Sequence, residues 1–328
     1  MTTSGPGRPQ RLMVLGASGF LGGHVRQQAG AAGLDVITAG RSPLPGSPAH
    51  CLVDLAAQDP ARLAGTLTTL APDVVVNCAG VTSGPPEALA QVNVTGTYDL
   101  VRAMLLAGCP ARLVHLGSAA EYGPGRPGTA VAESAPPRPA SAYGATKLAG
   151  THLVELGRAA GLDAVVLRVF NPVGPGAPDG ILPGRLVAEF RRALSEGSEV
   201  RLGPLDAVRD FVDARDVADA VIAAALTPRA GGVINVASGQ GRRARALARE
   251  LAAISGYDGP VHEDHGGSPR SAVPSWQQAD IGLARLLLGW QPRRSLGESL
   301  ADQWVAGGAP SGALEATMEG RCHGPASP

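Results

Sequence analysis

The stretch that most constrains the fold is a glycine-rich turn, Gly16-Ala17-Ser18-Gly19-Phe20-Leu21-Gly22, which follows the apolar run Leu12–Leu15. Apolar residues at helical spacing come next, so the pattern predicts a strand, a tight turn and a helix. Glycine lets the backbone pack closely, and free amides at a helix start attract an anionic pyrophosphate. The G-x-x-G-x-x-G spacing also occurs in plain strand-to-helix connections. Residues later in the chain must therefore decide whether this turn binds a dinucleotide. The residues expected to hold a dinucleotide here are Gly16, Ser18, Gly19, Phe20, Leu21 and Gly22.

The alternation of strand and helix continues along the chain. Buried parallel strands are predicted at 35–39, 73–77, 112–116 and 164–169, with a helical pattern between each of these strands and the next. This predicts an α/β fold with a Rossmann-type doubly wound parallel sheet. The rhythm becomes irregular after Phe170, which predicts a smaller, discontinuous C-terminal domain and an active site in the cleft between the two. The expected parts are 1–10 as a flexible N-terminus, 11–172 with 206–238 as the dinucleotide-binding domain, 173–205 with 239–305 as the substrate-binding domain, and 306–328 as a disordered tail.

Composition excludes several classes of protein. The 328 residues carry 28 basic and 28 acidic side chains, which is not the charge expected of a nucleic-acid binder. No signal peptide or membrane span is evident, so we expect a cytoplasmic protein without a membrane partner. The cysteines form no C-x-x-C pair, and His262-Glu263-Asp264-His265 lacks the H-E-x-x-H spacing. No metal is therefore expected.

The choice of coenzyme is indicated at the end of the second predicted strand. NAD sites usually place an acidic residue near this point to bind the adenosine ribose, whereas an arginine suits the 2′-phosphate of NADP. The chain has Arg41 and Ser42 there. Arg41 therefore favours NADPH as the coenzyme. The alternative interpretation is that Arg41 is a solvated loop arginine, which would leave NAD possible.

The residues that indicate chemistry are Tyr143 and Lys147, which are four positions apart on a predicted helix and so share one face. A nearby cation favours the phenolate of a tyrosine, whose usual pKa is ~10, and brings its proton into usable range. Ser118, at a predicted strand end, is placed to bond the same carbonyl oxygen. Together they predict a site that gives a ketone a proton while hydride moves to or from the adjacent carbon. His115 and Glu121 are interpreted as a packed strand residue and a loop carboxylate, neither of them catalytic.

With these residues, the sequence resembles the extended short-chain dehydrogenase/reductases, the family of NAD-dependent nucleotide-sugar epimerases, dehydratases and reductases. The resemblance covers roughly Arg11 to Trp304. The matching motifs are Gly16 to Gly22, Asp54-Leu55, Asn77-Cys78-Ala79-Gly80, Ser118, Tyr143 with Lys147, Phe170-Asn171-Pro172, and Arg209-Asp210-Phe211-Val212.

The resemblance implies roles for individual residues. Asp54 and Leu55 would contact adenine, Lys147 would also bind the nicotinamide ribose, and Asn171 would contact the sugar nucleotide. Arg209 and Arg270 would grip its diphosphate, although Arg209 could instead pair with Asp210 or Asp213. The remaining cofactor-binding residues are Cys78, Ala79, Gly80, Asn93, Tyr143 and Phe170, and the remaining substrate-binding residues are Thr82, Ser118 and Ala119.

The subfamily follows from what stands after Ser118. Dehydratases of the family carry an acidic pair there, whereas this chain has Ala119 and Ala120. With Arg41, this favours a nucleotide-sugar 4-ketoreductase, similar to reductases of GDP-4-keto-6-deoxymannose, acting on a dTDP- or GDP-linked 4-keto-6-deoxyhexose in deoxysugar biosynthesis. The alternatives are an NAD-dependent nucleotide-sugar epimerase and a non-catalytic NAD(P)-binding sensor. The resemblance also implies a homodimer.

Overall fold

The computed structural model describes residues 10–47, 49–108, 110–227, 230–263 and 275–307. The chain divides into two compact units. Unit 1 comprises Met1–Pro172, Ala207–Arg242 and Pro274–Arg293, and unit 2 comprises Val173–Asp206, Arg243–Val273 and Arg294–Pro328. The predicted N-terminal segment, the predicted tail beyond residue 307 and Arg270 lie outside the described residues.

Unit 1 is built on a seven-stranded sheet with the order β11-β6-β5-β4-β1-β2-β3. Each pair of neighbouring strands runs parallel, and the order reverses direction next to β1, so the predicted doubly wound α/β fold is confirmed. The central strands are buried because β-branched and aliphatic residues fill both faces. The strands are β1 (Arg11–Leu15), β2 (Asp35–Gly40), β3 (His50–Leu52), β4 (Val74–Asn77), β5 (Arg112–Ser118), β6 (Ala164–Val169) and β11 (Gly232–Val236).

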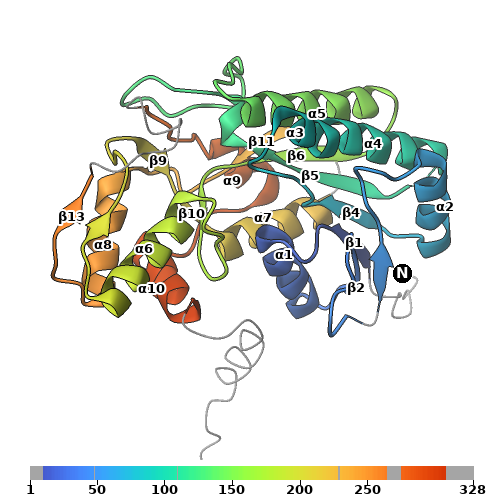
Figure 1. Cartoon of the computed structure of the whole chain (residues 1–328). Helices are drawn as coiled ribbons and strands as arrows, with labels where there is room; N and C mark the ends of the chain where they lie inside the picture. The colour runs from blue at the N-terminus through green and yellow to red at the C-terminus, as the bar shows by residue number, and fades with distance from the viewer. Residues whose placement is uncertain (1–9, 48, 109, 228–229, 264–274, 308–328) are drawn as a thin grey trace, which may run out of the picture. The chain divides into compact units, whose positions relative to one another are not determined.

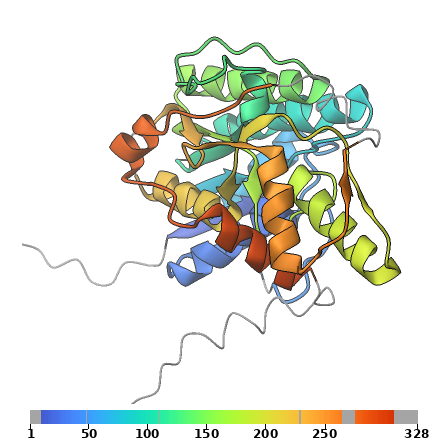
Figure 2. The same cartoon turned by 90° about the vertical axis from the view of Figure 1, so that its left-hand side faces the viewer.

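Helices cover both faces of this sheet. Figures 1 and 2 show α1 (Phe20–Ala31) and α7 (Ala214–Leu226) on one face, and α4 (Gly96–Leu106) and α5 (Ala142–Ala159) on the other. Each face has its own apolar core, one between the sheet and α1 and α7, the other between the sheet and α2 (Pro60–Leu70), α4 and α5. The sheet therefore presents its strand ends, where the candidate residues lie, from a rigid two-sided support.

One predicted helix is interrupted. The sequence predicts a continuous helix from Pro86 to Ala107, whereas the structure has α3 (Pro86–Ala90), a π-helical turn at Gln91–Thr95 and then α4. The turn contains Asn93, whose buried amide bonds to the backbone of Val81 instead of facing solvent. Such π-turns are frequent at functional sites.

A further difference concerns residues 274–293, which the sequence predicts within the smaller domain. The structure groups them with unit 1, where α9 (Gly282–Leu288) packs against β11 and α7. Bridges pair Gly125 with Trp276 and Val131 with Ala279, so the segment is tied to the loop that follows β5. The remaining short elements are the 3-10 turn Ala119–Glu121, β7 (Pro172–Val173), β9 (Val208–Asp210), β10 (Val212–Asp213) and β12 (Gly241–Arg243).

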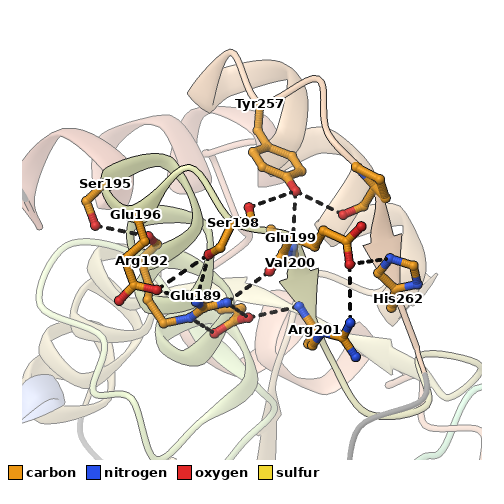
Figure 3. A network of polar contacts seen from close by, with 11 residues as sticks. Glu189, Arg192, Ser195, Glu196, Ser198, Glu199, Val200, Arg201, Tyr257 and His262 are labelled. Atoms are coloured by element: carbon orange, nitrogen blue, oxygen red, sulfur yellow. Dashed lines mark hydrogen bonds and ion pairs between the residues drawn. The ribbon is translucent and has the colours of Figure 1, made fainter.

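Unit 2 contains α6 (Leu182–Glu196), β8 (Val200–Arg201), α8 (Ala244–Ser255), β13 (Val261–His262) and α10 (Leu296–Ala306). Figure 3 shows a polar network between α6, β8 and β13. Arg192 lies at its centre and pairs with Glu189 at 2.8 Å and with Glu196 at 2.6 Å. The hydroxyl of Tyr257 accepts a hydrogen bond of 3.0 Å from the amide of Val200. These contacts fix β8 beside the end of α6.

The described acidic and histidine residues near β13 have close polar partners. His262 lies 3.1 Å from Glu199, and Glu263 pairs with Arg245 at 2.5 Å. Residues 264–265 lie outside the described part of the chain. Among the described residues, no group of three or more His, Cys, Asp or Glu side chains could hold a metal ion, and no described helix is long and apolar enough to span a membrane.

Candidate active site

The glycine turn between β1 and α1 is closely packed. Gly16 has φ of +74°, which favours glycine, and a Cβ there would lie 2.8 Å from the backbone nitrogen of Ala79. A Cβ on Gly22 would lie only 2.1 Å from the carbonyl oxygen of Gly16. Gly19 is the N-cap of α1 and offers no side-chain cap, so the first amides of α1 are left to a ligand. This arrangement fits a pyrophosphate. The neighbouring Ser18 is exposed, and Phe20 and Leu21 are half-buried in the first turn of α1.

The segment after β2 presents Arg41 and Ser42 to solvent. The loop that carries them is tied down at Thr38, whose hydroxyl lies 2.7 Å from the hydroxyl of Ser47 and 2.8 Å from Nδ1 of His50. Arg41 is therefore an exposed cation at the end of an anchored β-strand, which is a suitable position for recognising a phosphate.

The expected adenine-binding residues follow β3. The carboxylate of Asp54 accepts a hydrogen bond of 3.0 Å from the amide of Ala56, which shapes a turn. Leu55 is buried, and a Cβ on Gly96 would approach it to 3.0 Å, so α4 begins in direct contact with this turn. The Asp54–Leu55 turn is thereby fixed against α4.

The loop after β4 contains Cys78, Ala79 and Gly80. Burial raises the pKa of the Cys78 thiol to about 12, so it stays protonated at neutral pH. The side chain of Asn93 fixes the backbone of Val81, the residue after Gly80. It accepts a hydrogen bond from the amide of Val81 at 3.0 Å and donates one to the carbonyl of Val81 at 2.9 Å. Asn93 also donates to the hydroxyl of Thr146 in α5 at 3.1 Å. The side chain of Asn93 thus connects the loop after β4 to α5. Thr82, which follows Val81 directly, is exposed.

Ser118 and Tyr143 lie on backbones that touch. Ser118 ends β5, and its hydroxyl caps the 3-10 turn by accepting from the amide of Ala120 at 3.2 Å. Ser141 is the N-cap of α5, and a Cβ on Gly144 would lie 2.5 Å from the carbonyl oxygen of Ala120. Glycine at this position lets the first turn of α5, which carries Tyr143, approach the turn that follows Ser118.

Lys147 lies one helical turn further along α5 and is buried. Its Nζ donates a hydrogen bond of 2.6 Å to the carbonyl oxygen of Leu116 in β5. Burial lowers the pKa of this ammonium, and the carboxylate of Glu121 acts in the opposite direction. A buried cation one helical turn from a tyrosine is suited to favouring the phenolate of that tyrosine.

Glu121 is not a loop carboxylate, and that interpretation was wrong. It is fully buried in the 3-10 turn, where its carboxylate accepts from the backbone amide of Ser118 at 2.7 Å and pairs with Arg168 at 2.7 Å. The signal in the sequence was Ser118-x-x-Glu121, the spacing of a capping box. His115 is also fully buried, within β5, and its Nδ1 lies 3.1 Å from the side-chain nitrogen of Asn77, so its interpretation as a packed strand residue is confirmed.

The expected substrate-binding residues of unit 1 lie around β9. The side chain of Asn171 donates to the carbonyl of Asp210 at 2.9 Å. Arg209 donates to the hydroxyl and carbonyl oxygens of Ser275 at 2.7 and 2.9 Å. The carboxylate of Asp210 instead binds Ser238 and the amide of Ala279, and Asp213 pairs with Arg215.

Phe170 and Ala119 belong to one small core cluster with Tyr122. The side chain of Phe170 is fully buried and its ring centroid lies 6.2 Å from that of Tyr122. Phe170 therefore offers a ligand its backbone only. Arg270 lies outside the described residues, so its expected contact with a diphosphate stays a prediction.

Comparison with known proteins places these features in a family context. The model of the NAD dependent epimerase/dehydratase family matches residues 12–237. A dTDP-6-deoxy-L-talose 4-dehydrogenase (NAD(P)(+)) of Kitasatospora kifunensis is 40% identical over 309 residues, which covers 91% of this chain and 96% of the relative. A GDP-6-deoxy-D-mannose reductase of Pseudomonas aeruginosa is 30% identical, covering 89% and 95%. A UDP-glucose 4-epimerase of Mycolicibacterium smegmatis is 32% identical, covering 89% and 96%.

Two solved structures share the architecture. RMD from Pseudomonas aeruginosa complexed with NADPH has a TM-score of 0.77 at 28% identity, covering 91% of this chain and 97% of that one. MoeE5 in complex with UDP-glucose and NAD has a TM-score of 0.79 at 28% identity, covering 90% and 98%. The fold therefore occurs in similar proteins with either coenzyme.

Proposed function

Because the chain belongs to the NAD-dependent epimerase/dehydratase family of extended short-chain dehydrogenase/reductases, we propose that it reduces a nucleotide-linked 4-keto-6-deoxyhexose with NADPH. The observation that carries the proposal is the close contact between the turn that begins at Ser118 and the first turn of α5, the helix that bears Tyr143 and Lys147. The residues of the glycine turn fit a dinucleotide, since the first amides of α1 have no side-chain cap.

The chain's own residues supply the acid chemistry. The hydroxyl of Ser118 orients the ketone oxygen of the sugar, and the phenol of Tyr143 gives that oxygen a proton. Lys147 stabilises the resulting phenolate from its buried position against Leu116. When bound, NADPH supplies the hydride that reduces carbon 4 of the sugar.

Elimination of water is disfavoured by the residues after Ser118. Ala119 is buried and accepts a hydrogen bond from Gln277 through its backbone, and Ala120 has no acidic group. A dehydratase needs an additional acid and base at these positions. Two relatives in the comparisons are named as a 4-dehydrogenase and a reductase, which are the two directions of one hydride transfer at a sugar carbon. These names support a net redox reaction.

The preference for NADPH rests on Arg41. An exposed guanidinium directly after β2 can bind a 2′-phosphate with two hydrogen bonds, while no acidic side chain there is available to the ribose hydroxyls of NAD. For the substrate, Arg209 provides a second guanidinium, suited to a diphosphate. We assign it that contact together with Arg270, and Asn171 a contact with the sugar nucleotide.

A homodimer is also proposed. Apolar side chains are exposed on two neighbouring helices of unit 1, Tyr98 and Leu105 on α4 and Leu156 on α5. Their burial against a second copy would remove apolar surface from water. The mass of the protein in solution, measured by light scattering, tests this proposal.

The function is tested with dTDP-, GDP- and UDP-linked 4-keto-6-deoxy sugars, each assayed with NADPH and with NADH. We expect one equivalent of NADPH to be oxidised per 4-hydroxy sugar formed. Tyr143→Phe should lower kcat by ~10²- to 10⁴-fold, because the proton donor is lost, while NADPH binding is retained. A variant with a near wild-type rate would remove Tyr143 from the mechanism.

The relatives named as epimerases favour one alternative, a nucleotide-sugar 4-epimerase with NAD. This alternative predicts NAD that stays bound through purification and conversion of a UDP-sugar without net consumption of coenzyme. Such a result would replace the reductase proposal.

A further inference from the structure

A buried ion pair lies beneath the strand end that carries Ser118, and the proposed chemistry does not use it. Glu121 is 0% exposed and Arg168 is 4% exposed, with 2.7 Å between the carboxylate Oε2 and the guanidinium Nε. Removing two charges from water costs free energy even when the charges pair with each other. A buried ion pair therefore need not stabilise the fold, and stability alone does not explain its presence. Its bonding partners indicate what else it does.

Among the described residues, the Glu121 carboxylate bonds to three elements around the candidate active site. Oε1 accepts from the backbone amide of Ser118 at 2.7 Å. Oε2 accepts from the hydroxyl of Thr151 in α5 at 2.9 Å and from Arg168 in β6. The carboxylate thus joins the turn after β5, the helix that carries Tyr143, and the neighbouring strand. It holds in place the backbone of the residue whose hydroxyl is proposed to orient the ketone.

The surroundings are shaped around this pair. A Cβ on Gly117 would lie 2.7 Å from Oε1 of Glu121 and 3.0 Å from Cγ1 of Val166, so only glycine leaves room for the carboxylate. On the far side, the guanidinium of Arg168 stacks over the ring of Tyr122 at 4.5 Å. The hydroxyl of Tyr122 in turn donates to Asn235 at 2.8 Å.

Glu121 is also an electrostatic neighbour of Lys147. The charged groups that face it are Arg168 from β6 and Lys147 from α5, and Tyr122 follows it in the chain. Burial lowers the pKa of Lys147, and Glu121 is the strongest influence that raises it. The single carboxylate of Glu121 therefore lies near two buried cations, Arg168 and Lys147.

We propose that Glu121 is a positioning residue for the reduction, which fixes the backbone of Ser118 and places a buried negative charge near Lys147. The inference rests on the proposed function, and it assigns Glu121 an effect through Ser118 and Lys147 rather than through contact with the sugar.

Because Glu121 and Arg168 are charged, replacing either one should shift the pH dependence of kcat. A purely structural role would not produce such shifts of opposite sign. Removing a negative charge lowers the pKa of every acid nearby, and removing a positive charge raises it. Glu121→Gln should therefore move the alkaline limb of the kcat profile to lower pH, and Arg168→Gln should move it to higher pH. The signs are the same whether Tyr143 or Lys147 governs the limb, because both groups feel the same change.

The experiment compares pH profiles of kcat and KM for the wild type, Glu121→Gln, Arg168→Gln and Thr151→Val. Thr151→Val is the matched control, since it removes a buried hydrogen bond to Glu121 without changing charge, and it should keep the wild-type limb. Glu121→Gln should also lower kcat about tenfold at nearly constant KM, because Ser118 is displaced. Limbs that stay in place, or that move in the same direction in Glu121→Gln and Arg168→Gln, would overturn the inference.

If Glu121→Gln does not fold, Arg168→Gln and the double variant Glu121→Gln/Arg168→Gln decide. The double variant removes both charges, so its limb should return toward that of the wild type, and a limb that coincides with that of Arg168→Gln would contradict the inference.

A second readout separates this inference from the proposed function. The phenol of Tyr143 can be titrated in the coenzyme-free protein by its ultraviolet absorbance, with the same variant carrying Tyr143→Phe as the blank. The titration should shift downward in Glu121→Gln and upward in Arg168→Gln. An enzyme inactive on every 4-keto sugar would refute the proposed substrate, whereas an unshifted titration would refute the role of Glu121.

Discussion

Nζ of Lys147 donates a hydrogen bond of 2.6 Å to the carbonyl oxygen of Leu116, two residues before Ser118. The bond joins α5 to β5 at the level of the candidate active site. Because a buried ammonium needs a partner, it also sets the position of Lys147 relative to the strand that ends in Ser118. The same residue therefore anchors the helix and carries the charge that the proposed proton transfer needs.

Lys147→Met should abolish most activity without unfolding the protein. We expect kcat to fall by ~10²- to 10⁴-fold, because the phenolate of Tyr143 loses its cation. Since burial lowers the pKa of Lys147, the folded state binds fewer protons than the unfolded state below pH 10.5. Wild-type stability should thus rise with pH in the alkaline range, and Lys147→Met should lack this rise. Thermal unfolding at several pH values measures the difference, and parallel curves for the two proteins would contradict it.

Two adjacent glycines of α1 should respond in opposite ways. A Cβ on Gly22 would meet the carbonyl oxygen of Gly16 at 2.1 Å, whereas a Cβ on Gly23 would have nothing within 4 Å. Gly22→Ala should cost about 1–3 kcal/mol and weaken NADPH binding, because α1 must move away from the turn. Gly23→Ala should stabilise the protein by about 0.5–1 kcal/mol and leave binding intact. Denaturant unfolding and coenzyme fluorescence measure both, and equal effects would count against the close packing of the turn.

Arg41→Ala should change the coenzyme preference selectively. Loss of a guanidinium-phosphate contact should lower kcat/KM for NADPH by ~10- to 100-fold and leave the value for NADH nearly unchanged. Arg62→Ala, at another exposed arginine in α2, is the matched control and should alter neither coenzyme. Equal losses with NADPH and NADH in Arg41→Ala would show that Arg41 does not bind the 2′-phosphate.

Asp210 should give the protein a pH-dependent stability in the acidic range. Burial raises the pKa of its carboxyl from 3.8 to about 6, despite hydrogen bonds from Ser238 and Ala279. Between these values the folded state binds more protons than the unfolded state, so the free energy of unfolding falls as pH rises. Relative to Asp210→Asn, the wild type should lose about 3 kcal/mol between pH ~4 and ~7. Urea unfolding across this range measures the slope, and a constant difference between the two proteins would contradict it.

Local patterns were sufficient to predict the supporting sheet and to single out the candidate catalytic residues. The turn at Gly16, the helix start at Ser141 and the spacing from Tyr143 to Lys147 depend on neighbouring residues, which a sequence displays directly. The interrupted helix around Asn93 was not predicted, and the side chain of Asn93 bonds there to Val81, in a loop that approaches only in the folded chain.

Long-range contacts explain the remaining differences. Glu121 is buried because Arg168, forty-seven positions later, meets its carboxylate and Gly117 leaves it space, and neither contact follows from a capping-box spacing. Residues 274–293 join unit 1 through β-bridges such as the one between Gly125 and Trp276. The periodicity of the sequence does not predict such a long-range pairing. Arg209 likewise bonds to Ser275 across a separation of 66 residues.

The most direct test of the central claim is the fate of a deuterium label placed at the hydride position of NADPH. With the accepted 4-keto-6-deoxy sugar nucleotide, we expect one deuterium at carbon 4 of the sugar for each NADPH oxidised, measured by mass spectrometry and NMR. No oxidation of NADPH with any 4-keto sugar, together with inversion at carbon 4 of a UDP-linked 4-hydroxy sugar without net consumption of coenzyme, would contradict the reductase proposal and identify an epimerase.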